Sequence, residues 1–291
     1  MNFRTDLALE ATENTKNLTD SDVLQYEKIY GGVTVTHLKI LSRRAQNALQ
    51  KPAGNYITVD TPPLTDNEKE RDEIIGVLAK ELARFIPKEG VVLAVGLGNR
   101  AITPDALGPL AADMVLATRH IEKEFARSVG LEDLRAVAVL TPGVLGQTGT
   151  ESGEVTAGIC HIVNPAAIIA IDALAARSVH RLGTTIQISD TGIAPGAGVG
   201  NRRVPLTRDN LGIPVIAIGV PTVVDAATIA ADCGADDETV RAIAPAAQNL
   251  VVTPREIDLL VQRAAYLIAG GINAALQPDF SPSELISLAR G

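Results

Sequence analysis

Two aspartates that follow apolar runs are the residues whose placement most favours chemistry. The run Val91–Val95 enters the turn Gly96–Asn99, and Asp105 follows where a helical pattern begins. A second run, Ala167–Ile171, leads directly into Asp172. In open α/β sheets, ligands bind at the carboxyl ends of the strands. We therefore expect a two-carboxylate reaction centre, provided that the fold brings the two side chains together.

A pair of neighbouring carboxylates can divide the work of a general acid and a general base. Burial at the rim of a sheet disfavours the charged form of a carboxylate and so raises its pKa. One member of the pair then stays ionised and takes a proton from water, while the other holds a proton and polarises a carbonyl. This is peptide-bond hydrolysis of the aspartic type. The structural alternative is that Asp105 and Asp172 each stabilise a helix N-terminus.

Alternating strand and helix patterns predict the fold that must position these residues. β-forming runs predict strands at 33–36, 56–59, 91–96, 135–140, 167–172, 184–189 and 214–220. Helical spacing predicts helices at 65–86, 104–119, 173–181, 222–232 and 254–275, with loops at 141–158 and 190–201. This alternation is typical of a mainly parallel sheet with helices on both faces. We expect one α/β domain over residues 26–291, with a small extra β segment near its start, after a polar, irregular segment over residues 1–25.

The composition suits a globular α/β protein. Its 291 residues are 46% apolar but only 3% aromatic, and Trp is absent. A core of Ile, Val, Leu and Ala fits a parallel sheet that helices cover. The net charge of −8 argues against nucleic acid as a general partner.

Cysteine usage and the N-terminus bear on the compartment. Cys160 and Cys233 fit no metal or redox spacing, so we expect reduced, buried thiols in an intracellular protein. The first 15 residues contain Asp6, Glu10 and Glu13 and no apolar stretch, unlike a secretory signal. The sequence lacks a run of about 18 apolar residues, so no membrane partner is expected.

A glycine-rich segment over residues 189–203 is a second candidate for function. Gly196 and Gly198 free its backbone to approach a ligand closely, and the segment lacks the Gly-Lys-Ser/Thr of a phosphate loop. Arg202 and Arg203 follow and are suited to binding acidic side chains. We expect a substrate-facing loop. A flexible loop without function and unpartnered surface arginines are the alternatives.

Other common catalytic arrangements are missing from the sequence. The histidines are scattered and follow no strand-end pattern, at His37, His120, His161 and His180. There is no G-x-S-x-G elbow and no H-E-x-x-H motif. The first glycine turn lacks the third glycine of a dinucleotide site. These absences disfavour Ser-His-Asp, zinc and nicotinamide chemistry, and we expect no cofactor and no metal.

Four segments in order resemble one known family. They are GLGNRAITPDALGP (96–109), TPGVLGQTGTES (141–152), AIIAIDALAARS (167–178) and QISDTGIAPGAGVGNRR (187–203), which are similar to the spore germination protease family. The start RTDLALEA (4–11) is similar too, so the resemblance spans most of the chain. It implies an endopeptidase that begins to degrade small acid-soluble spore proteins during germination, once these proteins have left the DNA.

The resemblance also implies a site, a fold and an assembly. The family is regarded as aspartic-type, with two aspartates that fall on Asp105 and Asp172 of this chain. The implied fold is a three-layer α/β/α sandwich shared with the hydrogenase-maturation proteases. That cousin family binds nickel through two acids and a later histidine, whereas this chain has no histidine after His180. The implied assembly is a homotetramer in the cytoplasm of the spore core.

The family is made as an inactive zymogen that removes its own N-terminal propeptide. Only three residues precede RTDLA here, so we expect a short pro-segment and processing within residues 1–15. Family substrates are cut after glutamate, and we expect Arg202 and Arg203 to hold that side chain. Two alternatives remain open: a nickel-dependent maturation-type protease, and a non-enzymatic binding protein of the same fold.

Overall fold

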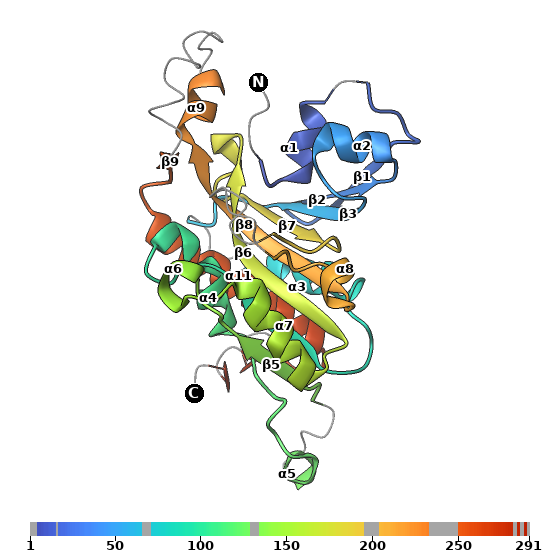
Figure 1. Cartoon of the computed structure of the whole chain (residues 1–291), viewed down its shortest axis with the longest axis vertical. Coiled ribbons are helices and arrows are strands. Elements are labelled where there is room, and N and C mark those ends of the chain that lie inside the picture. Colours follow the sequence, from blue (N-terminus) through green and yellow to red (C-terminus); the bar gives the residue numbers. More distant parts are fainter. Residues whose placement is uncertain are drawn as a thin grey trace.

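A mixed sheet of nine strands organises the residues that the computed structural model describes, which are 5–15, 17–65, 71–128, 134–194, 204–232, 250–281, 284–285 and 288–289 (Figure 1). The strands are β1 (Val23–Tyr30), β2 (Val33–Ile40), β3 (Gly54–Asp60), β4 (Val92–Gly96), β5 (Val137–Leu140), β6 (Ala167–Ala176), β7 (Thr185–Ser189), β8 (Val215–Asp225) and β9 (Val251–Val252). Their order is β1-β2-β3-β7-β8-β6-β4-β5, and β9 pairs with β8. β8, β6, β4 and β5 form a parallel core, which β7, β3, β2 and β1 extend by antiparallel pairing.

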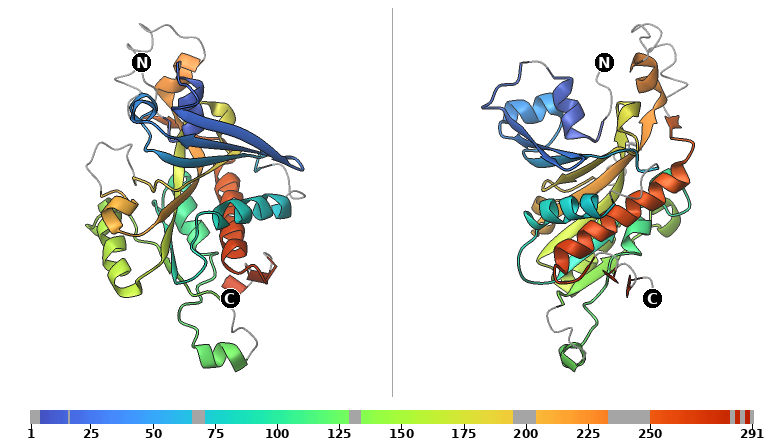
Figure 2. Two further views of the ribbon diagram at one scale, coloured as in Figure 1. Left: turned by 90° about the vertical axis from the view of Figure 1, so that its right-hand side faces the viewer. Right: turned by 180° about the vertical axis from the view of Figure 1, so that it is seen from behind.

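Helices cover both faces of this sheet. They are α1 (Ala8–Glu13), α2 (Arg43–Leu49), α3 (Arg71–Ala83), α4 (Leu107–Ala112), α5 (Lys123–Ser128), α6 (Leu145–Thr148), α7 (Ser152–Val163), α8 (Arg208–Leu211), α9 (Ala226–Asp232) and α11 (Ile257–Leu276), with 3₁₀ turns η1 (Thr103–Asp105) and η2 (Val179–Arg181). α3, α4 and α11 pack on one face. α7 covers the parallel end of the other face, and α1 and α2 cover its antiparallel end. Figure 2 shows α7 and α11 on opposite sides of the sheet.

The predicted α/β class is therefore confirmed, and each predicted strand corresponds to an observed one, β2 to β8. The strands near the N-terminus do not form a separate sheet, because β3 pairs with β7 and joins them to the parallel core. The segment over residues 141–158, expected to be a loop, contains α6 and most of α7.

The largest difference from expectation lies directly after Asp172. Residues 173–181 were expected to form a helix, but β6 continues to Ala176. Alanine and leucine favour helices locally. Here pairing with β8 overrides that preference, since Leu174 is opposite Pro221 and Ala176 is opposite Val224. β6 and β8 thus extend together beyond the end of β4.

The N-terminal segment also differs from expectation, because its described residues are structured. α1 spans Ala8–Glu13 and β1 begins at Val23. Leu7 and Ala8 are fully buried, and the Glu10 carboxylate accepts hydrogen bonds from the main chain beyond β6. This segment belongs to the packed structure and is not an irregular extension.

Helix α11 is a long apolar helix at the centre of one helical layer. Among the described residues it is the helix long and apolar enough to cross a membrane, but 67% of its apolar window is buried inside the molecule. It contacts α3 and α4, and its inner residues, such as Val261 and Ile268, are fully buried in the core. Its apolar character is therefore explained by packing within the domain.

A buried asparagine on α11 holds the chain that follows α4. Asn273 is 1% exposed; its Oδ1 accepts from the N–H of Leu116 at 2.9 Å, and its Nδ2 donates to the carbonyl of Met114 at 2.9 Å. Asn273→Ala removes both of these buried hydrogen bonds, so we expect a loss of about 2–3 kcal/mol in the free energy of unfolding. Urea denaturation measures this. Asn210→Ala, at an exposed asparagine that donates to Pro205, is the control; an equal loss in both variants contradicts the assignment.

Candidate active site

Asp105 is held by the turn that follows β4. The N–H of Asn99 donates to Oδ2 of Asp105 at 2.7 Å, and the N–H of Asp105 donates to the carbonyl of Ile102. Gly98 has a φ of +110°, and a Cβ there would lie 2.1 Å from the carbonyl oxygen of Asp105. Only glycine fits this close approach in this backbone conformation. The turn thus fixes a half-buried carboxylate just beyond the end of β4.

The start of α4 then brings η1 against the sheet. A Cβ at Gly108 would lie 2.1 Å from the carbonyl oxygen of Leu97 and 2.5 Å from that of Ile171, so α4 lies directly on β6. The hydroxyl of Thr222 donates to the carbonyl of Pro104 at 2.8 Å and ties η1 to β8. These two contacts place Asp105 over the neighbouring strands β6 and β8.

Asp172 lies on β6 one residue after its last pairing with β4, which joins Ile171 to Gly96. It is therefore at the carboxyl end of β4, although β6 itself continues. Asp172 is 7% exposed. Its Oδ1 accepts a hydrogen bond from the N–H of Ala173 at 2.9 Å. The expected strand end at Asp172 is wrong, because β6 continues to Ala176, and the helix of the alternative reading, which Asp172 would have capped, is absent.

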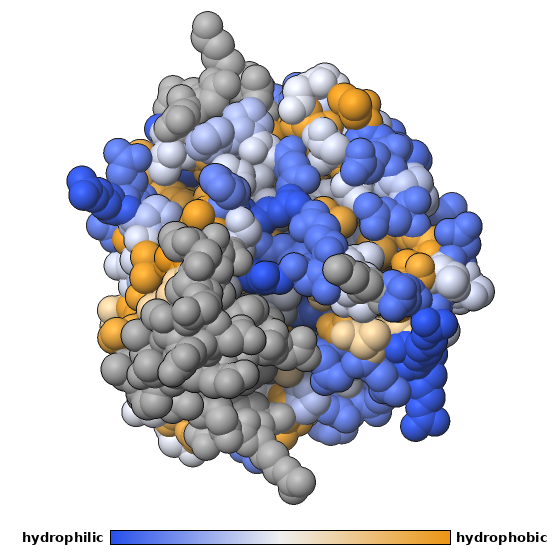
Figure 3. All heavy atoms as spheres, turned by 90° about the horizontal axis from the view of Figure 1, so that it is seen from above, coloured by the Kyte–Doolittle hydropathy of each residue, from blue (hydrophilic) through white to orange (hydrophobic). Residues whose placement is uncertain are grey.

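Asp105 and Asp172 line the same cavity, which has a volume of about 700 Å³. Its lining comes from β3, β6, β7 and β8, from η1, and from the chain that follows α2. β6, β8 and β7 form the floor of the cavity. There, Gly219 of β8 pairs with Asp172 of β6 on one side and with Gln187 of β7 on the other. Gly219 adds no side chain, so the floor stays open. Seen from above, hydrophilic residues gather around a hollow near the centre of this end of the molecule (Figure 3).

Several polar residues in this cavity were not predicted from the sequence. They are Asp6, Lys51, Tyr56, Gln187 and Ser189. Gln187 could have been noticed in the sequence, because it is a polar residue between Ile186 and Ile188 of an apolar strand. In the structure it is only 8% exposed. Asp6 could not have been noticed in this way, since its position depends on contacts with residues far along the chain.

Tyr56 lines the cavity, and its hydroxyl is hydrogen-bonded. Burial raises the pKa of Tyr56 to about 12, and its hydroxyl donates to the carbonyl of Pro52 at 2.9 Å. The phenol therefore stays protonated at neutral pH. A protonated phenol does not take a proton from water.

The predicted substrate-binding residues Gly196, Gly198, Arg202 and Arg203 lie outside the described residues, as does Cys233. The two ends of their loop are described. Ile193 and Leu206 form an antiparallel bridge, and both Ala194 and Pro205 line the cavity. Cys160 is buried as predicted, and burial raises the pKa of its thiol.

Among the described residues, no group of three His, Cys, Asp or Glu side chains is arranged to hold a metal ion. The described surroundings of Asp105 and Asp172 thus lack the third ligand that the nickel-dependent alternative requires, and we derive no step through a metal.

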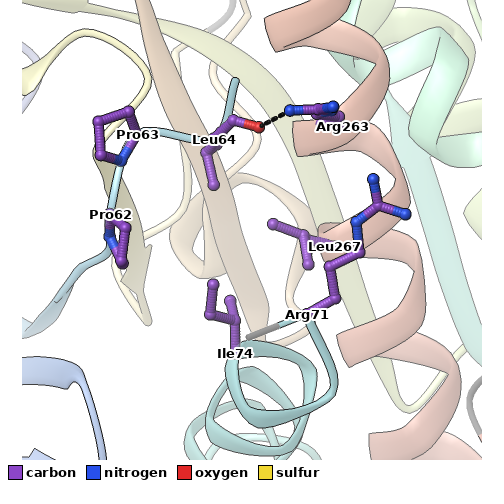
Figure 4. A pocket seen from close by; sticks show the side chains of 7 residues that line it. All are labelled: Pro62, Pro63, Leu64, Arg71, Ile74, Arg263 and Leu267. Carbon is purple, nitrogen blue, oxygen red and sulfur yellow. Dashed lines mark hydrogen bonds between the residues drawn. The ribbon is translucent and has the colours of Figure 1, made fainter. Parts of the chain in front are cut away.

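A second, much smaller pocket lies between the loop after β3 and α11 (Figure 4). Its volume is about 10 Å³, and it is lined by Pro62, Pro63, Leu64, Arg71, Ile74, Arg263 and Leu267. A water molecule needs about 10–15 Å³. Arg263 donates to the carbonyl of Leu64 at 3.1 Å, which fixes this loop on α11. The pocket is a feature of packing and too small for a ligand.

Comparison with known proteins gives a consistent result. Residues 4–235 match the family model described as germination protease. The germination protease of Caldanaerobacter subterraneus subsp. tengcongensis is 43% identical, over 99% of this chain and 98% of the relative. That of Clostridium perfringens is 40% identical over 96% of each chain, and that of Bacillus pumilus is 36% identical over 97% of this chain and 95% of the relative.

Among solved structures, a NiFe hydrogenase maturation protease from Thermococcus kodakarensis aligns with a TM-score of 0.36 and 20% identity, over 65% of this chain and 96% of that chain. The three relatives named above, which match nearly the whole length of this chain, are germination proteases. From the family match and these full-length relatives, we conclude that the chain belongs to the germination protease family, a family of peptidases.

Proposed function

We propose that this peptidase cleaves small acid-soluble spore proteins by an aspartic-type reaction in which Asp105 and Asp172 are the two catalytic carboxyls. The observation that carries the proposal is their meeting in one cavity of about 700 Å³. A cavity of this size accommodates several residues of an extended substrate. The two aspartates come from different elements, η1 and β6, and glycines at 98 and 108 allow the close packing between them.

The two carboxyls divide the proton transfers of hydrolysis. One is ionised and takes a proton from a water molecule as the water oxygen adds to the carbonyl carbon of the peptide. The other is protonated and donates to the carbonyl oxygen. When the C–N bond breaks, a proton passes to the leaving nitrogen, and both carboxyls return to their starting states. Two carboxylates that line one cavity repel each other when both are ionised, which favours this shared protonation.

The loop between Ala194 and Pro205 is proposed to bind the substrate. Ala194 and Pro205, the described residues on either side, line the same cavity as the two aspartates, and only a short stretch of chain joins Arg202 and Arg203 to them. We propose that they hold the glutamate after which the substrate is cut. An arginine–carboxylate pair is bidentate and strong.

Replacing Arg202 and Arg203 together by Ala is expected to lower kcat/KM for a glutamate-containing peptide by about 100-fold. The free energy of unfolding is expected to change little, because the loop ends are held by the bridge between Ile193 and Leu206. Steady-state kinetics on paired peptides with Glu and Gln at the cleavage position measure the effect. If the variant still prefers Glu over Gln as strongly as the parent, the assignment is wrong.

We also propose that the protein is a homotetramer of the spore core, made as a zymogen that removes residues within 1–15. A single experiment tests substrate and processing together. The purified protein is incubated with an acid extract of spore proteins, and intact masses of both are followed with and without a chelator. Cleavage of the small acid-soluble proteins and a shortened N-terminus, both insensitive to the chelator, are expected. An unchanged extract favours the binding-protein alternative.

A further inference from the structure

The chain between β5 and α7 forms a closed loop that contains α6. Its two ends are tied together, because the hydroxyl of the buried Ser152 donates to the carbonyl of Gly143 at 2.9 Å. Residues 146–150 are nevertheless exposed. α7, which follows, packs on the sheet through Cys160, so the loop extends from a fixed base. A loop built in this way can hold neighbouring parts of the chain in place.

Gln147, on α6, reaches across to the turn that follows β4. Its Nε2 donates to Oδ1 of Asn99 at 2.8 Å. The same oxygen accepts from the N–H of Ala101 at 2.9 Å, which is the hydrogen bond of an Asx turn. An amide oxygen has two lone pairs, and here both are used. The contact with Gln147 therefore fixes the side chain of Asn99 and, through the Asx turn, its main chain.

The main chain of Asn99 in turn holds the carboxylate of Asp105. Its N–H donates to Oδ2 of Asp105 at 2.7 Å, and its carbonyl accepts from the N–H of Ile102 at 3.0 Å. Asn99 thus connects α6 to a proposed catalytic carboxyl, with its side chain on one side and its main chain on the other. By this route Gln147 influences the orientation of Asp105 without touching it.

The other end of the same loop contacts the chain beside the proposed substrate loop. A Cβ at Gly153, in the first turn of α7, would lie 2.5 Å from the carbonyl oxygen of Val204 and 2.8 Å from its Cβ. Val204 directly precedes Pro205, which lines the cavity. Glycine at position 153 therefore allows α7 to support the main chain of Val204 at close range.

We propose that residues 143–153 are a positioning element that holds the turn of Asp105 through Gln147 and the end of the substrate loop through Gly153. Gln147 is a positioning residue, because it acts through Asn99. The inference rests on the proposed function, since it concerns the carboxyl of Asp105 and the loop that is proposed to bind substrate. The two contacts have separate kinetic effects: the orientation of the carboxyl affects kcat, and the placement of the loop affects KM.

Gln147→Ala is expected to lower kcat about tenfold for a peptide with glutamate at the cleavage position, because catalysis is sensitive to small misplacements of the reacting groups. KM is expected to change less than about twofold. Gln147→Glu keeps the size of the side chain but turns an acceptor toward Oδ1 of Asn99, so we expect at least the same loss. Gly146→Ala, exposed on α6 with no atom within 4 Å of its added Cβ, is the matched control and keeps the parental kcat.

Removal of Asn99 shows whether Gln147 acts through it. Asn99→Ala removes the shared acceptor and is expected to lower kcat about 20-fold, and adding Gln147→Ala is expected to cause no further loss. Parental kcat in both Gln147 variants, or a further tenfold loss in the double variant, overturns the proposal.

Hydrogen exchange provides a readout that needs no turnover. In the Gln147→Ala protein, the amide of Asn99 is expected to exchange at least about fivefold faster than in the parent, because its contact with Asp105 is less firmly held. In the Gly146→Ala protein the same amide is expected to keep its parental rate. Equal rates in the two variants also overturn the proposal.

Gly153→Ala tests the other contact. It displaces Val204 and is expected to raise KM about tenfold with little change in kcat. Val204→Ala weakens the same contact without adding bulk and is expected to raise KM about threefold. Gly158→Ala, on the same helix with no atom within 4 Å of its added Cβ, is the matched control. Parental KM in both the Gly153→Ala and Val204→Ala proteins overturns this part of the proposal.

These failures differ from a failure of the proposed function. The proposed function fails if the Asp105→Asn protein keeps the parental kcat. The positioning element fails if Asp105→Asn is inactive while the Gln147 and Gly153 variants behave as their controls do.

Discussion

Asp105→Asn and Asp172→Asn are each expected to lower kcat for a cleavable peptide by about 1000-fold or more, because residues that act as one catalytic unit lose most of their effect together. An amide has the shape of the carboxyl but neither takes nor gives the proton. The double variant is expected to have a kcat no lower than that of the less active single variant, since the pair works as a unit. Steady-state kinetics on purified protein measure all three.

The control for this prediction is Asp113→Asn. Asp113 caps the end of α4 near the site, and it forms an exposed ion pair with Arg100 at 2.6 Å. Exposed pairs contribute about 0–1 kcal/mol, so this variant should keep its activity and its stability. If either Asp105→Asn or Asp172→Asn retains parental kcat while the fold is intact, the two-carboxylate mechanism is wrong.

Gly108→Ala is expected to destabilise the protein strongly. Its Cβ would lie 2.1 Å from the carbonyl oxygen and 2.5 Å from the nitrogen of Leu97, and 2.5 Å from the carbonyl oxygen of Ile171. These are backbone atoms of β6 and of Leu97, the residue directly after β4, and they cannot swing aside, so α4 must move away from the sheet. We expect a loss of about 3 kcal/mol or more in the free energy of unfolding.

The same displacement moves Asp105 away from Asp172, because η1 leads directly into α4. A misplacement of about 1 Å lowers catalysis by about 100-fold, so the folded fraction of Gly108→Ala should also lose activity. Gly158→Ala is the matched control: it is exposed on α7, and no atom lies within 4 Å of its added Cβ. Alanine there is expected to stabilise by about 0.5–1 kcal/mol. Equal melting temperatures for the two variants contradict the close packing of α4 on the sheet.

Local sequence patterns singled out Asp105 and Asp172, which line the same cavity. A continuous apolar run predicts a buried strand, and the first polar residue after it lies at the rim of the sheet. That reasoning needs no knowledge of which strands are neighbours. β6 continues past Asp172, but β4 ends at the same level of the sheet, so Asp172 lies beside the end of a neighbouring strand.

The parts of the site that sequence reasoning missed depend on contacts between distant residues. Residues 173–176 read as a helix because the pairing of Leu174 with Pro221 is invisible locally. Asp6 reached the cavity through a hydrogen bond to Ala175, a residue 169 positions away. Gln187 was visible as a polar residue between two buried isoleucines, but the partner of its amide could not be foreseen.

The most direct test of the central claim is the crystal structure of the protein with a peptide in which a hydroxyl-bearing isostere replaces the cleaved bond. That hydroxyl stands in for the oxygen of the attacking water. The account predicts that it lies within hydrogen-bond distance of the carboxyl groups of both Asp105 and Asp172. An isostere bound with its hydroxyl touching only one of these aspartates, or outside their cavity, would contradict it.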